Sequence, residues 1–120
     1  MRGRPVLLII LLFLAGCYND KESILYPESA CVPPTAPSYQ ADIVPILSQH
    51  CTSCHSGTFA SGNVLLDSYA EVKKYTDNGQ LMGTITWASG YSPMPKNGNK
   101  LPHCHVATLQ TWISTGAPNN

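Results

Sequence analysis

Arginine is missing from the chain after residue 4. The 120 residues carry seven basic and seven acidic side chains, and the only arginines are Arg2 and Arg4. Without its first 16 residues, the chain keeps five lysines against seven acids, a net charge of −2. Proteins that bind nucleic acid instead gather lysine and arginine on one face, where these side chains neutralise phosphates. The composition therefore excludes nucleic acid as a partner.

Long apolar runs are also missing. The run from Val6 to Ala15 is too short for a mature transmembrane helix, which needs about 20 apolar residues. Because Arg2 and Arg4 precede this run, the segment has the layout of a secretory signal. We therefore expect residues 1–16 to be a signal peptide that the mature protein lacks.

The end of this segment points to a lipid anchor. Residues 14–17, LAGC, resemble the lipobox of bacterial lipoproteins, whose cysteine is lipidated before cleavage. The alternative is an ordinary signal peptide with a cysteine near its cleavage site. In the lipoprotein interpretation, Cys17 becomes the N-terminus and carries several acyl chains, enough for stable anchoring. This places the protein in the cell envelope of a Gram-negative bacterium, in the periplasm or at the cell surface, anchored to a membrane.

Residues 17–37 have the composition of a tether. They mix acids, serines and prolines without helical or strand periodicity, and Pro33, Pro34 and Pro37 favour a semi-rigid extended backbone. The globular domain is expected over residues 38–120. A domain of this size has a core that barely offsets chain entropy, so a covalent crosslink or a cofactor is commonly needed.

Strand-like alternation is missing from that domain as well. Apolar residues at helical spacing predict four helices: residues 42–50, a segment following Asp67, residues 80–87 and residues 103–115. Asp42 and Asp67 are expected N-caps, and Gly116 is an expected stop signal. The glycine- and proline-rich connections are long for a small bundle, which suits a chain that wraps a large apolar group. The sequence predicts an all-α fold.

Residues 51–55, CTSCH, are typical of covalent haem attachment. Cys51 and Cys54 lie three positions apart, so on one helical turn both thiols face the same edge and can form thioethers with one haem. His55 can then bind the iron as proximal ligand. His50 lies on this same side, which makes it a poor candidate for the opposite position.

Two other chemistries compete for this motif. Zinc would need further ligands, and the only other cluster, His103, Cys104 and His105, lies too far along the chain for compact finger spacing. A thioredoxin-like redox disulfide would need alternating strands and helices, and it would leave His55 without a role. Neither alternative explains the long loops.

The sixth ligand of such a haem is expected to be Met94. It lies in the segment SPMP, where Pro93 and Pro95 restrict the backbone and remove two amide donors. Met82 lies in an apolar helical segment, which favours a place in the core. The alternative for Met94 is a packing role under the loop. The rival candidates for the sixth ligand are His103 and His105.

With these residues, the segment from about residue 38 to 118 resembles a small monohaem class I cytochrome c. It is most similar to the lipid-anchored cytochrome c domains of the Bacteroidetes and Planctomycetes type. The resemblance implies a cytochrome c fold in which helices 42–50 and 103–115 cross, with one covalent haem c held beneath them. It implies Cys51 and Cys54 as thioether sites, with His55 and Met94 as axial ligands. The chain departs from soluble members in having little of their lysine-rich face.

The two remaining cysteines, Cys31 in the tether and Cys104 at the start of the last helix, are expected to form a disulfide. Free thiols are uncommon outside the cytoplasm. The bridge would hold the proline-rich tether against the globular domain. By the loop-entropy model it would contribute roughly 4 kcal/mol.

A haem with both axial positions filled leaves no site for oxygen or peroxide. The sequence therefore predicts a monomeric electron carrier that passes single electrons between redox partner proteins, and not an enzyme. Lys96 and Lys100 could orient an acidic partner, although such lysines are more often simply solvated. An open sixth position would instead give a peroxidase-like enzyme, with His103 or His105 as distal base. A third possibility is a haem- or metal-stabilised binding module.

Overall fold

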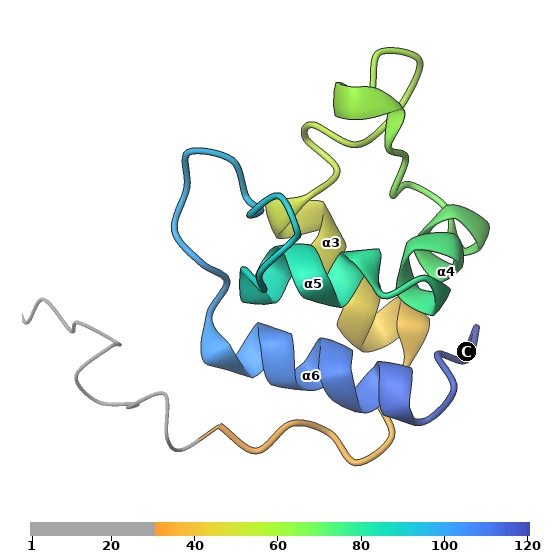
Figure 1. Cartoon of the computed structure of the whole chain (residues 1–120). Coiled ribbons are helices and arrows are strands. Elements are labelled where there is room, and N and C mark those ends of the chain that lie inside the picture. Colours follow the sequence, from red (N-terminus) through yellow and green to blue (C-terminus); the bar gives the residue numbers. More distant parts are fainter. Residues whose placement is uncertain (1–30) are drawn as a thin grey trace, which may run out of the picture.

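The computed structural model describes residues 31–120. Predictions for the signal peptide, for lipidation of Cys17 and for tether residues 17–30 lie outside the described residues. Within residues 31–120 every regular element is helical and no strand occurs, so the all-α prediction is confirmed for this part (Figure 1). No helix in this part has the length and apolar character needed to cross a membrane.

The N-terminal helical stretch consists of the π-helix η2 (Tyr39–Ile43) and the α-helix α3 (Val44–His50). Ser38 caps it, because its hydroxyl accepts a hydrogen bond from the Ala41 amide at 3.3 Å. The prediction of Asp42 as N-cap is wrong, since Asp42 lies inside η2. Its carboxylate instead accepts from the Ser38 amide at 2.7 Å, so the two side chains satisfy free amides reciprocally.

Helix α4 (Tyr69–Asp77) begins one residue later than predicted, so the prediction of Asp67 as its N-cap is wrong. Ser68 is the N-cap, and its hydroxyl accepts from the Glu71 amide at 3.4 Å. A serine followed three residues later by a glutamate is the pattern of a capping box. The predicted cap, Asp67, accepts instead from the Gly57 amide at 3.1 Å, which ties the loop after the CTSCH motif to the start of α4.

Two further α-helices complete the domain, α5 (Gln80–Thr86) and α6 (His103–Ser114). A short 3₁₀ turn, η3 (Ser61–Asn63), interrupts the loop between α3 and α4. Gly116 follows α6 with φ of +95°, a left-handed conformation that glycine adopts freely, so the predicted stop signal is confirmed.

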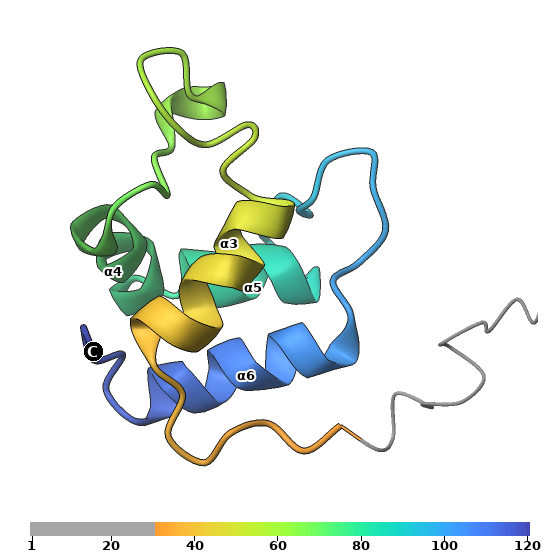
Figure 2. The same ribbon diagram turned by 180° about the vertical axis from the view of Figure 1, so that it is seen from behind.

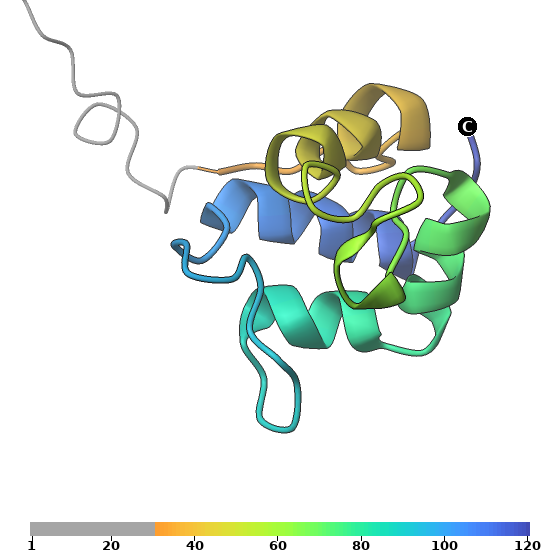
Figure 3. The same ribbon diagram turned by 90° about the horizontal axis from the view of Figure 1, so that it is seen from above.

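The core forms where η2 and α5 both pack on α6. Figure 2 shows the η2–α3 stretch running diagonally past α6, and Figure 3 shows α6 between this stretch and α5. Trp112 of α6 is fully buried, and its indole N–H donates to the Pro118 carbonyl at 3.0 Å. Tyr39 packs against it with ring centroids 5.6 Å apart, and Tyr39 also meets Tyr69 edge-on at 5.0 Å. This aromatic cluster packs η2, α4 and α6 against one another.

Cys31 and Cys104 form a disulfide with their Cα atoms 5.4 Å apart, in agreement with the predicted pairing. The bridge holds the described part of the tether at the start of α6. Residues 32–36 are otherwise mostly exposed, and Val32 keeps 88 % of its surface accessible.

Candidate functional site

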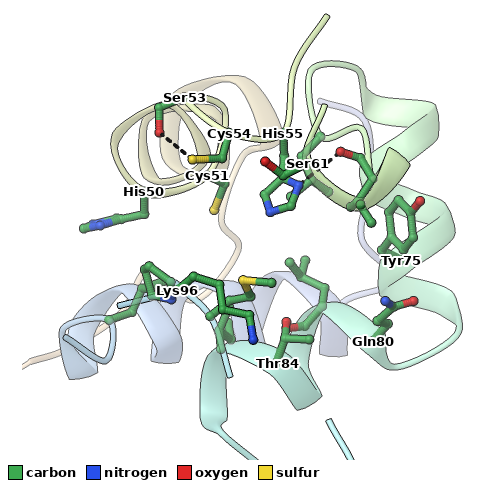
Figure 4. A pocket seen from close by; sticks show the side chains of 18 residues that line it. His50, Cys51, Ser53, Cys54, His55, Ser61, Tyr75, Gln80, Thr84 and Lys96 are labelled. Carbon is green, nitrogen blue, oxygen red and sulfur yellow. Dashed lines mark hydrogen bonds between the residues drawn. The ribbon is translucent and has the colours of Figure 1, made fainter. Parts of the chain in front are cut away.

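A cavity of about 540 Å³ opens between the turn that follows α3, helix α5 and the loop that precedes α6 (Figure 4). Its volume lies in the range of cofactor sites, and such sites are typically lined by apolar side chains with a few polar groups. The apolar wall is made by the side chains Val64, Leu66, Leu81, Ile85 and Leu101. The cavity also contains all four of the residues predicted to hold a cofactor, Cys51, Cys54, His55 and Met94.

Cys51 and Cys54 lie on a tight turn that continues from α3. The Cys51 amide donates to the Leu47 carbonyl at 2.8 Å, and the Cys54 amide donates to the Cys51 carbonyl at 3.1 Å. Both are free thiols; Cys51 is half-buried and Cys54 is exposed. Burial raises the pKa of the Cys51 thiol to about 11, so this sulfur is protonated at neutral pH. As they stand, the two sulfurs line one edge of the cavity and are available for covalent attachment.

His55 points its imidazole into the cavity (Figure 4). Its Nδ1 lies 3.1 Å from the carbonyl oxygen of Val64. Because a carbonyl can only accept, Nδ1 carries the proton, and the lone pair resides on Nε2. A second bond, from the Leu66 amide to the His55 carbonyl at 2.8 Å, closes the loop around the ring. His55 is thus oriented as metal-binding histidines commonly are, with one nitrogen held by the protein and the other free.

Met94 enters the cavity from the side of α5. Its amide donates to the Thr84 carbonyl at 3.1 Å, and its own carbonyl accepts from the Trp87 indole N–H at 2.9 Å. Thr84 lies across the cavity from His55 in Figure 4, so Met94 is anchored to the wall opposite the histidine. A nitrogen and a thioether sulfur on facing walls can bind a metal from its two axial directions.

The rival ligands lie elsewhere. His105 of α6 does not line the cavity; its Nδ1 lies 3.0 Å from Nε2 of His50, and His103 is exposed. Burial, and next the charge of His50, lower the pKa of His105. His50 borders the cavity, but its ring is directed away from His55 (Figure 4). Met82 packs half-buried against the core, as expected, and is not part of the lining.

The geometry gives no support to the two competing chemistries. Among residues 31–120, no three histidine, cysteine or acidic side chains are placed to hold a metal ion together. Cys104 is committed to its disulfide and is unavailable as a zinc ligand. A thioredoxin-like arrangement lacks its sheet, since the described part of the chain has no strand.

Several lining residues were not predicted from the sequence. Tyr75 of α4 borders the cavity, and Gln80 and Thr84 of α5 lie on the side opposite His55 in Figure 4. Of the two lysines that the sequence suggested for partner docking, Lys96 is in the lining and Lys100 is not. The apolar spacing of α4 and α5 was the available signal, but it does not tell which apolar residues face a cavity and which face the core.

Comparison with family models, with curated proteins and with solved structures finds no significant match to this chain. The interpretation of the site therefore rests on the geometry and chemistry of its own side chains.

Proposed function

We propose that this protein is a monohaem c-type cytochrome that carries single electrons. One observation carries the proposal: a single cavity has Cys51, Cys54 and His55 on one wall and Met94 anchored to the opposite wall. The first three residues form the attachment motif of a covalent haem. The fourth supplies a soft sulfur ligand from the other side.

Each residue has a defined role in this proposal. Cys51 and Cys54 would form two thioether bonds by adding their S–H groups across the vinyl groups of one haem, and their position on one turn would set the edge at which it is held. His55 would offer its Nε2 lone pair to the iron, while the Val64 carbonyl keeps Nδ1 protonated and orients the ring. Met94 would offer its thioether sulfur from the α5 side. The haem, when bound, supplies a one-electron couple between ferric and ferrous iron.

Electron transfer is favoured over catalysis because His55 and Met94 would be available to fill both axial positions of a bound haem. Peroxidase-like chemistry would need an open position and a nearby acid or base. Besides His55, the only histidine in the lining is His50, whose Nε2 is engaged by His105. We further propose that lipidated Cys17 anchors the domain to a membrane of the cell envelope, and that its partners are redox proteins.

The decisive experiment is to express the chain with its leader in a host that attaches c-type haem, and to purify the holoprotein. We expect one covalently bound haem, a low-spin ferric spectrum with the weak red-end band of methionine ligation, and a reversible one-electron titration. Cys51→Ala with Cys54→Ala should abolish covalent attachment. A protein that takes up zinc or no cofactor would contradict the proposal.

Two methionine variants assign the sixth ligand. Met94→Leu should keep the haem but lose the red-end band, and the iron should then bind added imidazole or cyanide readily. Met82→Leu is the matched control, because Met82 is not in the cavity lining, and its spectrum should equal that of the parent. A high-spin ferric parent protein, unchanged by Met94→Leu, would instead indicate an open iron and favour the peroxidase-like alternative.

A further inference from the structure

The loop that carries Met94 folds back along α5. Helix α5 is followed by Trp87, which adopts a left-handed conformation with φ of +61°, and the Ala88 amide then donates to the Gly83 carbonyl at 2.9 Å. The chain reverses and returns past the helix, as the excursion after α5 in Figure 3 shows. The Tyr91 amide donates to the Ala88 carbonyl at 3.2 Å and tightens the reversal.

Tyr91 lies against the bare backbone of Gly83. A Cβ atom added to Gly83 would lie only 2.5 to 2.6 Å from three atoms of the tyrosine ring, closer than real Cβ contacts allow. Gly83 lies inside α5 and not in a left-handed conformation, so its backbone does not require glycine. In a helix interior, glycine costs about 1 kcal/mol relative to alanine. The benefit of glycine here is the space that it leaves for the ring.

Both backbone polar groups of Met94 are also tied to α5 or its end. The Met94 amide donates to the Thr84 carbonyl, and the Trp87 indole donates to the Met94 carbonyl. Pro93 and Pro95 have no amide N–H. The Met94 amide is therefore the only backbone donor in this three-residue segment, and α5 uses it.

We propose that Trp87 and Tyr91, with Gly83 as the seat for the tyrosine ring, are positioning residues that hold Met94 at the iron. This inference rests on the proposed function and deepens it. None of the three needs to touch the cofactor; they fix the loop so that its thioether stays within reach in both oxidation states. A loop held this way loses little conformational freedom when the sulfur binds, which favours ligation over competition by outside ligands.

Competition by imidazole on the ferric holoprotein measures this effect, since imidazole binds the iron only when Met94 leaves. Gly83→Ala overpacks against Tyr91, and we expect imidazole to bind about tenfold more tightly than in the parent, with a weaker red-end band. Trp87→Phe removes one hydrogen bond to the Met94 carbonyl, and we expect a gain of about threefold. The reduction potential should fall in both variants, because loss of methionine ligation disfavours ferrous iron.

Two controls separate the loop contact from general damage to α5. Gly98→Ala lies just beyond Met94, and its added Cβ would meet Pro95 at an ordinary 3.4 Å, so this variant should behave as the parent. Tyr91→Phe keeps the ring, whose hydroxyl lies 3.7 Å from the Cβ position of Gly79, and it should also behave as the parent.

The pair Gly83→Ala and Tyr91→Ala gives the sharpest test. Tyr91→Ala fills no space and should fold, while imidazole should bind more tightly because the ring no longer holds the loop. Adding Gly83→Ala to Tyr91→Ala should then have little further effect. An equal effect of Gly83→Ala with and without the tyrosine would overturn the inference, as would parent-like imidazole affinity in Tyr91→Ala and Trp87→Phe. A parent protein without haem or without the methionine band would overturn the proposed function instead.

Discussion

Removal of the Cys31–Cys104 disulfide should destabilise the domain mainly through the unfolded chain. The two cysteines are 73 residues apart in sequence, and the chain-entropy model gives about 4 kcal/mol for a loop of this length. The native state should lose few packing contacts when the bridge is removed, because residues 32–36 are mostly exposed. The covalent haem proposed at Cys51 and Cys54 would close only a very short loop, so it would not replace this long-range constraint.

Guanidinium unfolding of the parent and of Cys31→Ser with Cys104→Ser checks this expectation. The free energy of unfolding should fall by about 4 kcal/mol. The m-value should rise, since an unfolded chain without the crosslink expands and exposes more surface. Most of the change should appear as slower folding, with a nearly constant unfolding rate.

Reduction of the parent protein provides an internal control, because it should reproduce the double variant, whereas the double variant itself should not respond to reductant. Val32→Ser, in the exposed tether, should leave stability unchanged. An unchanged free energy of unfolding, or a loss seen entirely as faster unfolding, would refute the reasoning and show that the tether contributes through native contacts.

Three further outcomes are expected. In protein made without haem, iodoacetamide should modify exposed Cys54 well before Cys51, whose raised pKa of about 11 keeps it a thiol; mass spectrometry of timed samples shows the order. The pKa of His105 lies below its ordinary 6.5 because of burial and His50, so the unfolded chain binds more protons in mild acid and stability should fall as the pH drops below about 6.5. Thermal melts at several pH values should show a shallower decline in His105→Gln. Trp112→Ala should cost about 3 to 5 kcal/mol of stability in denaturant unfolding, because a fully buried ring and its bond to Pro118 are lost; a loss below 1 kcal/mol would contradict this packing.

The helices were predictable from apolar spacing, whereas their caps were only partly so. Asp67 and Ser68 are adjacent, and both are good N-cap residues. The structure uses Ser68 because Asp67 is engaged by the Gly57 amide, a contact across a loop that local sequence does not reveal. Asp42 shows the same difficulty, since its carboxylate serves the helix start from inside η2.

The candidate site was predictable where its functional residues form a short sequence motif. Cys51, Cys54 and His55 form one motif, and Met94 is marked by its two prolines. The partners that orient them were not predictable, because Val64 and Thr84 contribute only carbonyl oxygens, which every residue has. Gly83 was equally hidden, since a glycine kept for space looks the same in sequence as one kept for a turn.

Helix α6 supports both the wall of the cavity that carries His55 and the wall that carries Met94. The turn bearing Cys51 and His55 continues from the η2–α3 stretch, and η2 packs on α6. Met94 is bonded to α5, which also packs on α6. A shift of either element on α6 would therefore change the distance between His55 and Met94, although α6 itself contributes no residue to the lining. A cavity-creating change in the core of α6, such as Leu109→Ala, should accordingly weaken methionine ligation as well as stability, while changes on the exposed face of α4 should affect neither.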